Sequence, residues 1–94
     1  MGHVRRKPKL LPIKLVLIRE SLGIVLVDMA QKLKTRSGRV SNYENGNSEP
    51  TLMELLVYAR LGKVELESIV DDEISLDSFR KLFGKQNRRT SSRA

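Results

Sequence analysis

Basic side chains dominate one stretch in the middle of the chain. The residues from Met29 to Tyr43 include no acid, and Lys32, Lys34, Arg36 and Arg39 fall among them. The whole chain has 18 Lys and Arg against 11 Asp and Glu, and its net charge is +7. A polyanion is therefore the first partner to consider. The alternative is that these charges are only a solvated surface.

The remaining residue types do not assemble into a catalytic or metal-binding site. The chain has no Cys, and its single His, His3, has no second His or Cys with which to share a metal ion. The acidic run of Asp71, Asp72, Glu73 and Asp77 lacks the Gly and the ligand spacing of a calcium loop. No nucleophile with a neighbouring base and no phosphate loop can be identified. The sequence predicts a binding protein with no cofactor or metal, not an enzyme.

The 94 residues suffice for one small domain with short extensions. Residues 1–9 hold four basic side chains and residues 80–94 hold six, and neither stretch contains an acid. We expect a basic flexible tail at 1–9, a domain at 10–74, and a short helix followed by a basic disordered tail at 75–94. The tails either contact phosphates or only keep the protein in solution.

The start of the chain does not have the pattern of an export signal. Its apolar run, Leu10–Ile18, is interrupted by Pro12 and Lys14. Arg19 and Glu20 then occupy the place of a small-residue cleavage site. No segment approaches the roughly 20 apolar residues that cross a bilayer. We expect a cytoplasmic protein with no membrane partner.

Apolar periodicity predicts helices in the first half. Four residues spaced i, i+4, i+7 and i+11 form one helical face, and Gly23 is a suitable end. They are Leu11, Leu15, Ile18 and Leu22. Two further short helices are predicted at Asp28–Lys34 and Ser37–Tyr43. Because the joint between them is residues 34–36, these two helices should cross steeply.

The second half begins with the clearest boundary in the sequence. Thr51 and Glu54 have the spacing of a capping box, in which each side chain bonds a backbone amide at the helix start. Gly62 is predicted to end this helix. Its expected buried stripe is Leu52, Leu55, Leu56 and Ala59. A short fifth helix is predicted from Val64, Leu66, Ile69 and Val70. No alternating strand pattern occurs, so the domain should be all-α.

A last short helix is predicted near the C-terminus, with Asp77 as its cap and Gly84 as its end. Its apolar side would be Phe79, Leu82 and Phe83. The first predicted helix has more apolar surface than one stripe requires, so this last helix or another chain should cover a second face of it. The additional apolar residues are Leu10, Ile13, Val16 and Leu17.

The stretch MAQKLKTRSGRVSNYENG, Met29 to Gly46, resembles the Cro/CI-type (XRE-like) helix-turn-helix family of bacterial and phage regulators. The family's spacing is met over about 60 residues, from Leu11 to Val70. Matching positions outside the two short helices include Arg19, Glu20, Gly23, Pro50, Leu55 and Leu56. The resemblance implies an all-α, five-helix, lambda-repressor-like domain.

The resemblance also implies which residues contact DNA bases. In the helix that would enter the major groove, they are Ser37, Gly38, Arg39 and Asn42. Asn42 is the best base reader, because its amide can donate and accept at adenine. Arg39 could read guanine or hold a phosphate, and both roles stay open. Gly38 costs about 1 kcal/mol of helix stability relative to Ala, which is tolerable if the helix must approach DNA closely.

Phosphate contacts are implied at five further positions, where they set register without reading sequence. They are Lys34, Arg36, Ser41, Asn45 and Asn47. Arg19 and Glu44 match a pair that, in the family, ties the first helix to the end of the third. Its role would be alignment of these helices, since a partly buried ion pair can cost as much as it returns.

The sequence departs from the family at the start of the second helix. Val25 and Leu26 replace the usual Ser or Thr followed by Gln, so a cap and a phosphate contact are lost. With Val27 they form an apolar patch that suggests a protein contact. The usual Gly of the turn is Lys34, which would adopt a left-handed conformation at a cost of roughly 1 kcal/mol.

Two functions are therefore expected. The first is a sequence-specific regulator of transcription, in particular a repressor, that binds double-stranded DNA with helix 37–43. As a homodimer it would recognise half-sites about 10 base pairs apart. The second is a protein interaction module, such as an antitoxin-like or anti-repressor partner, that uses Val25, Leu26 and Val27. RNA binding is less favoured, because the sequence offers no obvious exposed aromatic platform.

Overall fold

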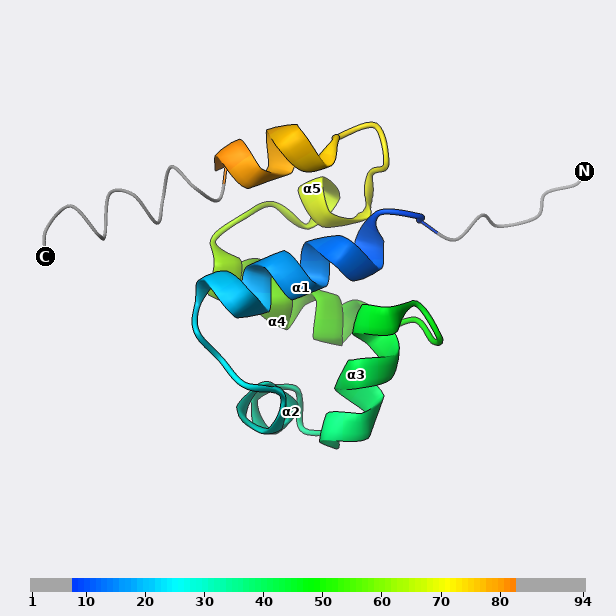
Figure 1. Ribbon diagram of the computed structural model, residues 1–94, viewed down its shortest axis with the longest axis vertical. Coiled ribbons are helices and arrows are strands. Elements are labelled where there is room, and N and C mark those ends of the chain that lie inside the picture. Colours follow the sequence, from blue (N-terminus) through cyan, green and yellow to red (C-terminus); the bar gives the residue numbers. More distant parts are fainter. Residues whose placement is uncertain (1–7, 83–94) are drawn as a thin grey trace, which may run out of the picture.

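The computed structural model describes residues 8–82, and these residues form helices without strands (Figure 1). In chain order the helices are α1 Leu11–Ser21, α2 Leu26–Leu33, α3 Ser37–Asn45, α4 Leu52–Gly62 and α5 Leu66–Val70. A further helix spans residues 76–82 and is orange in Figure 1. In that view α1 lies in the middle, with α5 and helix 76–82 on one side and α2 and α3 on the other. The expectation of an all-α protein is confirmed.

Two helix starts follow side-chain capping. At α4 the Glu54 backbone N–H donates to Thr51 Oγ1 at 3.1 Å, and the Thr51 N–H donates to Glu54 Oε1 at 2.9 Å, so the predicted capping box is present. The helix at 76–82 begins differently from the prediction. Ser75, not Asp77, caps it, because the Ser78 N–H donates to Ser75 Oγ at 3.2 Å. Asp77 therefore lies in the first turn of that helix.

Of two other boundaries, one differs from the prediction and one agrees with it. Helix α2 begins at Leu26 instead of Asp28, because the chain is extended only as far as Val25. Helix α4 ends at Gly62, as predicted, and this last residue is buried. Lys63 takes the left-handed conformation that ends the helix, at φ 55° and ψ 43°. The left-handed conformation thus falls on Lys63, the residue after the glycine.

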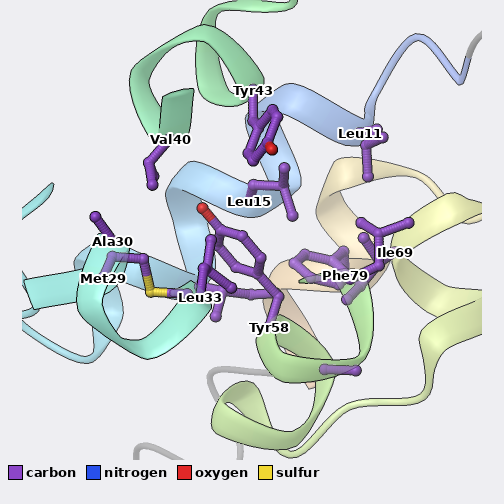
Figure 2. Close-up of a cluster of buried hydrophobic side chains, with 13 residues drawn as sticks. Leu11, Leu15, Met29, Ala30, Leu33, Val40, Tyr43, Tyr58, Ile69 and Phe79 are labelled. Atoms are coloured by element: carbon purple, nitrogen blue, oxygen red, sulfur yellow. The ribbon is translucent and has the colours of Figure 1, made fainter. Parts of the chain in front are cut away.

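The core surrounds α1 and takes a buried side chain from each of the described helices (Figure 2). Its members are Leu11, Leu15, Ile18, Met29, Ala30, Leu33, Val40, Tyr43, Leu55, Tyr58, Ala59, Ile69 and Phe79. Three residues of the predicted buried stripes lie outside it: Leu52 is 62% exposed, Leu22 follows the last residue of α1 and is 38% exposed, and Leu56 is half-buried. The first turn of α4 projects beyond the core, since Met53 is exposed as well.

The C-terminal helix covers part of α1, as expected. Phe79 is fully buried, and the Lys14 Nζ atom of α1 lies 5.4 Å from the centre of its ring. Leu82 does not join this contact and stays exposed, whereas Phe83 and Gly84 lie outside the described residues. On α1 itself, Leu17 packs against the core, but Ile13 remains exposed.

The N-terminal approach to α1 is fixed by a carboxylate from the far end of the chain. The backbone N–H groups of Lys9 and Leu10 donate to the two Asp72 carboxylate oxygens at 2.9 and 3.0 Å. These two bonds hold the pKa of the Asp72 carboxyl below its usual value. Most of both predicted tails, residues 1–7 and 83–94, lies outside the described part of the chain.

Candidate nucleic-acid interface

Helices α2 and α3 form a pair joined by residues 34–36 alone. Figure 1 shows α2 nearly end-on and α3 running across the view, so the two cross steeply, as predicted. Lys34 makes the turn with a left-handed backbone, φ 60° and ψ 47°. The Thr35 N–H donates to the Ala30 carbonyl oxygen at 2.9 Å, which closes the end of α2. The left-handed conformation expected at Lys34 is thus present, and this turn directs α3 steeply across α2.

Helix α3 has a buried side and an exposed side. Val40, Tyr43 and Glu44 are buried and attach the helix to the core. The exposed side consists of Gly38, Arg39, Asn42 and Asn45. Residues three and four apart are neighbours on a helix surface, so these four positions form one continuous strip. We call it the α3 strip.

The residues expected to contact bases all lie at or beside this strip. Gly38, Arg39 and Asn42 belong to it, and Ser37 is half-buried at its N-terminal end. The positions expected to contact phosphate flank it. Lys34 and Arg36 are exposed in the turn before α3, and Asn47 is exposed in the loop after it.

Ser41 and Asn45 pair with each other along α3. Asn45 Nδ2 donates to Ser41 Oγ at 3.3 Å. A hydroxyl and a primary amide each retain a further proton after this bond. Both side chains can therefore still donate to an anionic acceptor.

Arg39 does not extend freely into solvent, because its Nε donates to the Tyr43 hydroxyl oxygen at 3.3 Å. This bond, together with the attraction of Tyr43 and Glu54, raises the pKa of Arg39 above its ordinary value. Tyr43 is 1% exposed, and its pKa is raised first by burial and further by the negative charge of Glu54. The guanidinium of an exposed residue thus contacts a buried phenol.

Gly38 has no structural role within the described part of the chain. A Cβ atom built on it meets nothing within 4 Å, and its backbone lies in helix α3. Ala at this position would favour the helix by about 1 kcal/mol. The missing side chain leaves the α3 backbone open to close approach by another molecule.

Glu44 anchors the C-terminal end of α3 to two other helices. Arg19 Nε of α1 donates to both carboxylate oxygens, at 2.9 and 3.0 Å, and Arg19 Nη1 donates to the Ile24 carbonyl oxygen at 2.9 Å. The Tyr58 hydroxyl of α4 donates to Glu44 Oε2 at 2.9 Å. Burial and the neighbouring carboxylate raise the pKa of Tyr58. The ion pair expected from the resemblance is present, and it fixes the position of the α3 strip.

Sequence reasoning missed Tyr58, which is fully buried between α4 and the Glu44 carboxylate. Its spacing of three residues from Leu55 was a usable signal for the same helical face. No sequence signal identified the hydrogen-bond partner of the Tyr58 hydroxyl, because Glu44 lies 14 residues away in the chain.

The apolar patch at the start of α2 is smaller than predicted. Val25 and Val27 are each 58% exposed, but Leu26 packs against the core. Val25 is the N-cap residue, and no side chain bonds the first amides of α2. The resemblance implied that α2 lacks a side-chain cap, and the structure confirms this. The exposed part of the patch is two valines.

A buried charge lies near the N-terminal end of α1, at Lys14, and sequence reasoning did not identify it. Lys14 is fully buried, and its Nζ donates to the carbonyl oxygens of Ser68 at 2.8 Å and Asp71 at 3.0 Å. Burial lowers the pKa of Lys14, while Asp72 and Asp71 act in the opposite direction. This ammonium closes the C-terminal end of α5. We call Lys14 with its partners Ser68, Asp71 and Phe79 the Lys14 cluster.

Comparison of the chain with models of protein families, with curated proteins and with solved structures gives no match. No helix within residues 8–82 has the length and apolar character needed to cross a membrane. In the same residues, no group of three His, Cys, Asp or Glu side chains is placed to hold a metal ion.

Proposed function

We propose that this chain is a Cro/CI-type helix-turn-helix regulator that binds double-stranded DNA and reads its sequence with the α3 strip. The observation that carries the proposal is the strip itself. Arg39 and Asn42 stand one turn apart on an exposed helix face, beside a glycine that nothing inside the described chain requires. An α-helix fits the major groove, where Asn pairs with adenine and Arg with guanine.

The charges around the strip support the same proposal. Lys32, Lys34 and Arg36 are exposed on α2 and in the turn, with no acid between Met29 and Tyr43. Six of the 11 acids lie between residues 65 and 77, on α5, the segment after it and helix 76–82, on the opposite side of α1 in Figure 1. They are Glu65, Glu67, Asp71, Asp72, Glu73 and Asp77. Such a separation of charge would turn the α3 side towards a polyanion.

The rigidity of the strip is a further support. The Glu44 carboxylate binds α3 to Arg19 of α1 and Tyr58 of α4. A reading helix must be held at fixed depth and register, because base contacts depend on geometry while phosphate contacts only position the protein. In a two-fold dimer, two such helices would meet half-sites about 10 base pairs apart and repress by occupying a promoter.

The proposal is tested by selecting bound fragments from sheared genomic DNA at about 0.15 M salt, where nonspecific attraction to phosphates is weakened. We expect a two-fold sequence motif with the wild-type chain and none with the variant Arg39→Ala/Asn42→Ala. Arg80→Ala is a matched control, since it removes an exposed guanidinium from helix 76–82. It should recover the same motif. Uniform recovery of all sequences by the wild type would refute sequence-specific binding.

A second function, a protein interaction module, is favoured by the exposed Val25 and Val27. Its partner would contact these side chains at the start of α2. The variant Val25→Ser/Val27→Gln separates the two proposals, because it removes the apolar surface and leaves the α3 strip unchanged. Loss of function with retained DNA binding would favour the interaction module. Leu26 is unsuited to this test because it packs against the core.

A further inference from the structure

We infer that Tyr43 is a positioning residue that presents Arg39 for reading a guanine rather than for holding a phosphate. This inference rests on the proposed DNA-binding function and deepens it. The observation behind it is the bond from Arg39 Nε to the Tyr43 hydroxyl oxygen, 3.3 Å long, made in the protein without DNA.

The Tyr43 ring is held in place by the core. Tyr43 is 1% exposed and belongs to the buried cluster that attaches α3 to the other helices. A phenol oxygen can accept a hydrogen bond while its own proton points elsewhere, so it offers a lone pair to Arg39 Nε. A buried, fixed ring thereby sets the direction of a side chain on the exposed face of α3.

The bond also selects which edge of the guanidinium is free. Arg has five N–H donors in a planar fork, and Tyr43 occupies the one on Nε. The four N–H groups on the two Nη atoms remain for a ligand. Two parallel donors from this end match the O6 and N7 acceptors of guanine. A phosphate can also accept two parallel donors, but its oxygens point in several directions and so accept a mobile arginine, whereas the edge of a base requires one fixed direction.

The neighbours of Arg39 agree with this reading. Asn42, three residues further along α3, shares the exposed face, and Gly38 leaves the adjacent backbone bare. Arg39 therefore stands among groups suited to the groove floor. The side chains suited to phosphate, Lys34 and Arg36, lie in the turn before the helix.

The experiment compares base preference among four proteins: wild type, Arg39→Ala, Tyr43→Phe and the double variant. Arg39→Ala first identifies the operator position whose guanine preference depends on Arg39. Affinity is then measured for operators carrying each of the four bases there. We expect Tyr43→Phe to lower the preference for guanine about fivefold, the usual effect of one hydrogen bond. In the Arg39→Ala background the same change should have no effect on this preference.

Phe79→Leu is the control for stability, because it also alters a fully buried aromatic side chain but lies on helix 76–82, away from the α3 strip. Partial unfolding lowers affinity for all four operators equally, so the ratio between them isolates positioning from stability. An unchanged ratio in Tyr43→Phe, or an equal loss for all four bases, would overturn the role of Tyr43 while leaving DNA binding intact. A wild-type chain that selects no motif would overturn the proposed function and this inference together.

Discussion

The Lys14 cluster and the α3 strip differ in where their polar side chains find partners. At Lys14 the ammonium is fully buried, and two carbonyl oxygens and an aromatic ring surround it. On the α3 strip, Arg39 is partly held by Tyr43, while Asn42 is exposed. The first region uses its charge to close the fold, and the second leaves donors directed outward. Polar groups whose partners are inside the chain stabilise it, and those held rigidly at the surface are available to another molecule.

The largest effect expected from this comparison is a loss of stability at Lys14. Lys14→Ala removes the stem and the ammonium, so a cavity forms and the carbonyls of Ser68 and Asp71 lose their donor. We expect a loss of about 3 kcal/mol in the free energy of unfolding. Lys14→Met keeps most of the volume and should lose less, about 1 to 2 kcal/mol. Denaturant unfolding measures both. Equal stability of Lys14→Ala and wild type would show that this cluster does not close the fold.

Gly38→Ala should separate stability from binding on the α3 strip. The added methyl group meets nothing within 4 Å in the free protein, so we expect a gain of about 0.5 to 1 kcal/mol in unfolding free energy. If α3 approaches DNA closely, affinity for the selected operator should fall about tenfold, or about 1.4 kcal/mol. Thermal unfolding and titration of the operator measure the two quantities. A more stable variant with unchanged affinity would argue that no ligand approaches at Gly38.

Val25→Ser tests whether the start of α2 affects the stability of the fold, as the Lys14 cluster does, or the binding of DNA, as the α3 strip does. Ser at the N-cap can accept an amide hydrogen that Val25 leaves without a side-chain partner. We expect a gain in unfolding free energy of about 0.5 to 1 kcal/mol, with DNA affinity kept or slightly raised. Val27→Ser is a useful comparison, because it removes similar apolar surface without supplying a cap. A loss of DNA affinity in Val25→Ser would mean that the valine itself contacts the ligand.

The smallest effect concerns the pH dependence at Asp72. Its pKa is lowered in the folded protein by the N–H groups of Lys9 and Leu10. The stabilisation is therefore complete above the unfolded value of 3.8 and is lost as the pH falls through the lower, folded pKa. Below about pH 4, the free energy of unfolding should change less steeply with pH in Asp72→Asn than in the wild type. Parallel curves for the two proteins would assign the acid dependence to other groups.

The two regions differ in how far the sequence predicts them. Helical spacing predicts the side of α3 that turns outward, because Val40 and Tyr43 mark its buried side. The left-handed turn at Lys34 could also be predicted, from the short joint and the resemblance. Both features depend on residues close together in the chain.

The Lys14 cluster could not be predicted in the same way. Its ammonium bonds carbonyl oxygens 54 and 57 residues away, and in the sequence it only interrupts an apolar run. The partnership of Tyr58 with Glu44 is hidden for the same reason. Ser75 caps helix 76–82 where Asp77 was predicted to, and the sequence could not decide between them because Ser and Asp are both good capping residues.

The most direct test of the account is a ratio of affinities at about 0.15 M salt: that for the selected operator divided by that for a scrambled duplex of equal length. For the wild type we expect a ratio of about a thousand or more. For Arg39→Ala/Asn42→Ala it should fall close to one, while Lys14→Met, measured where it is folded, should keep the wild-type value. A ratio near one for the wild type, or an undiminished ratio in the double variant, would contradict the claim that the α3 strip reads DNA.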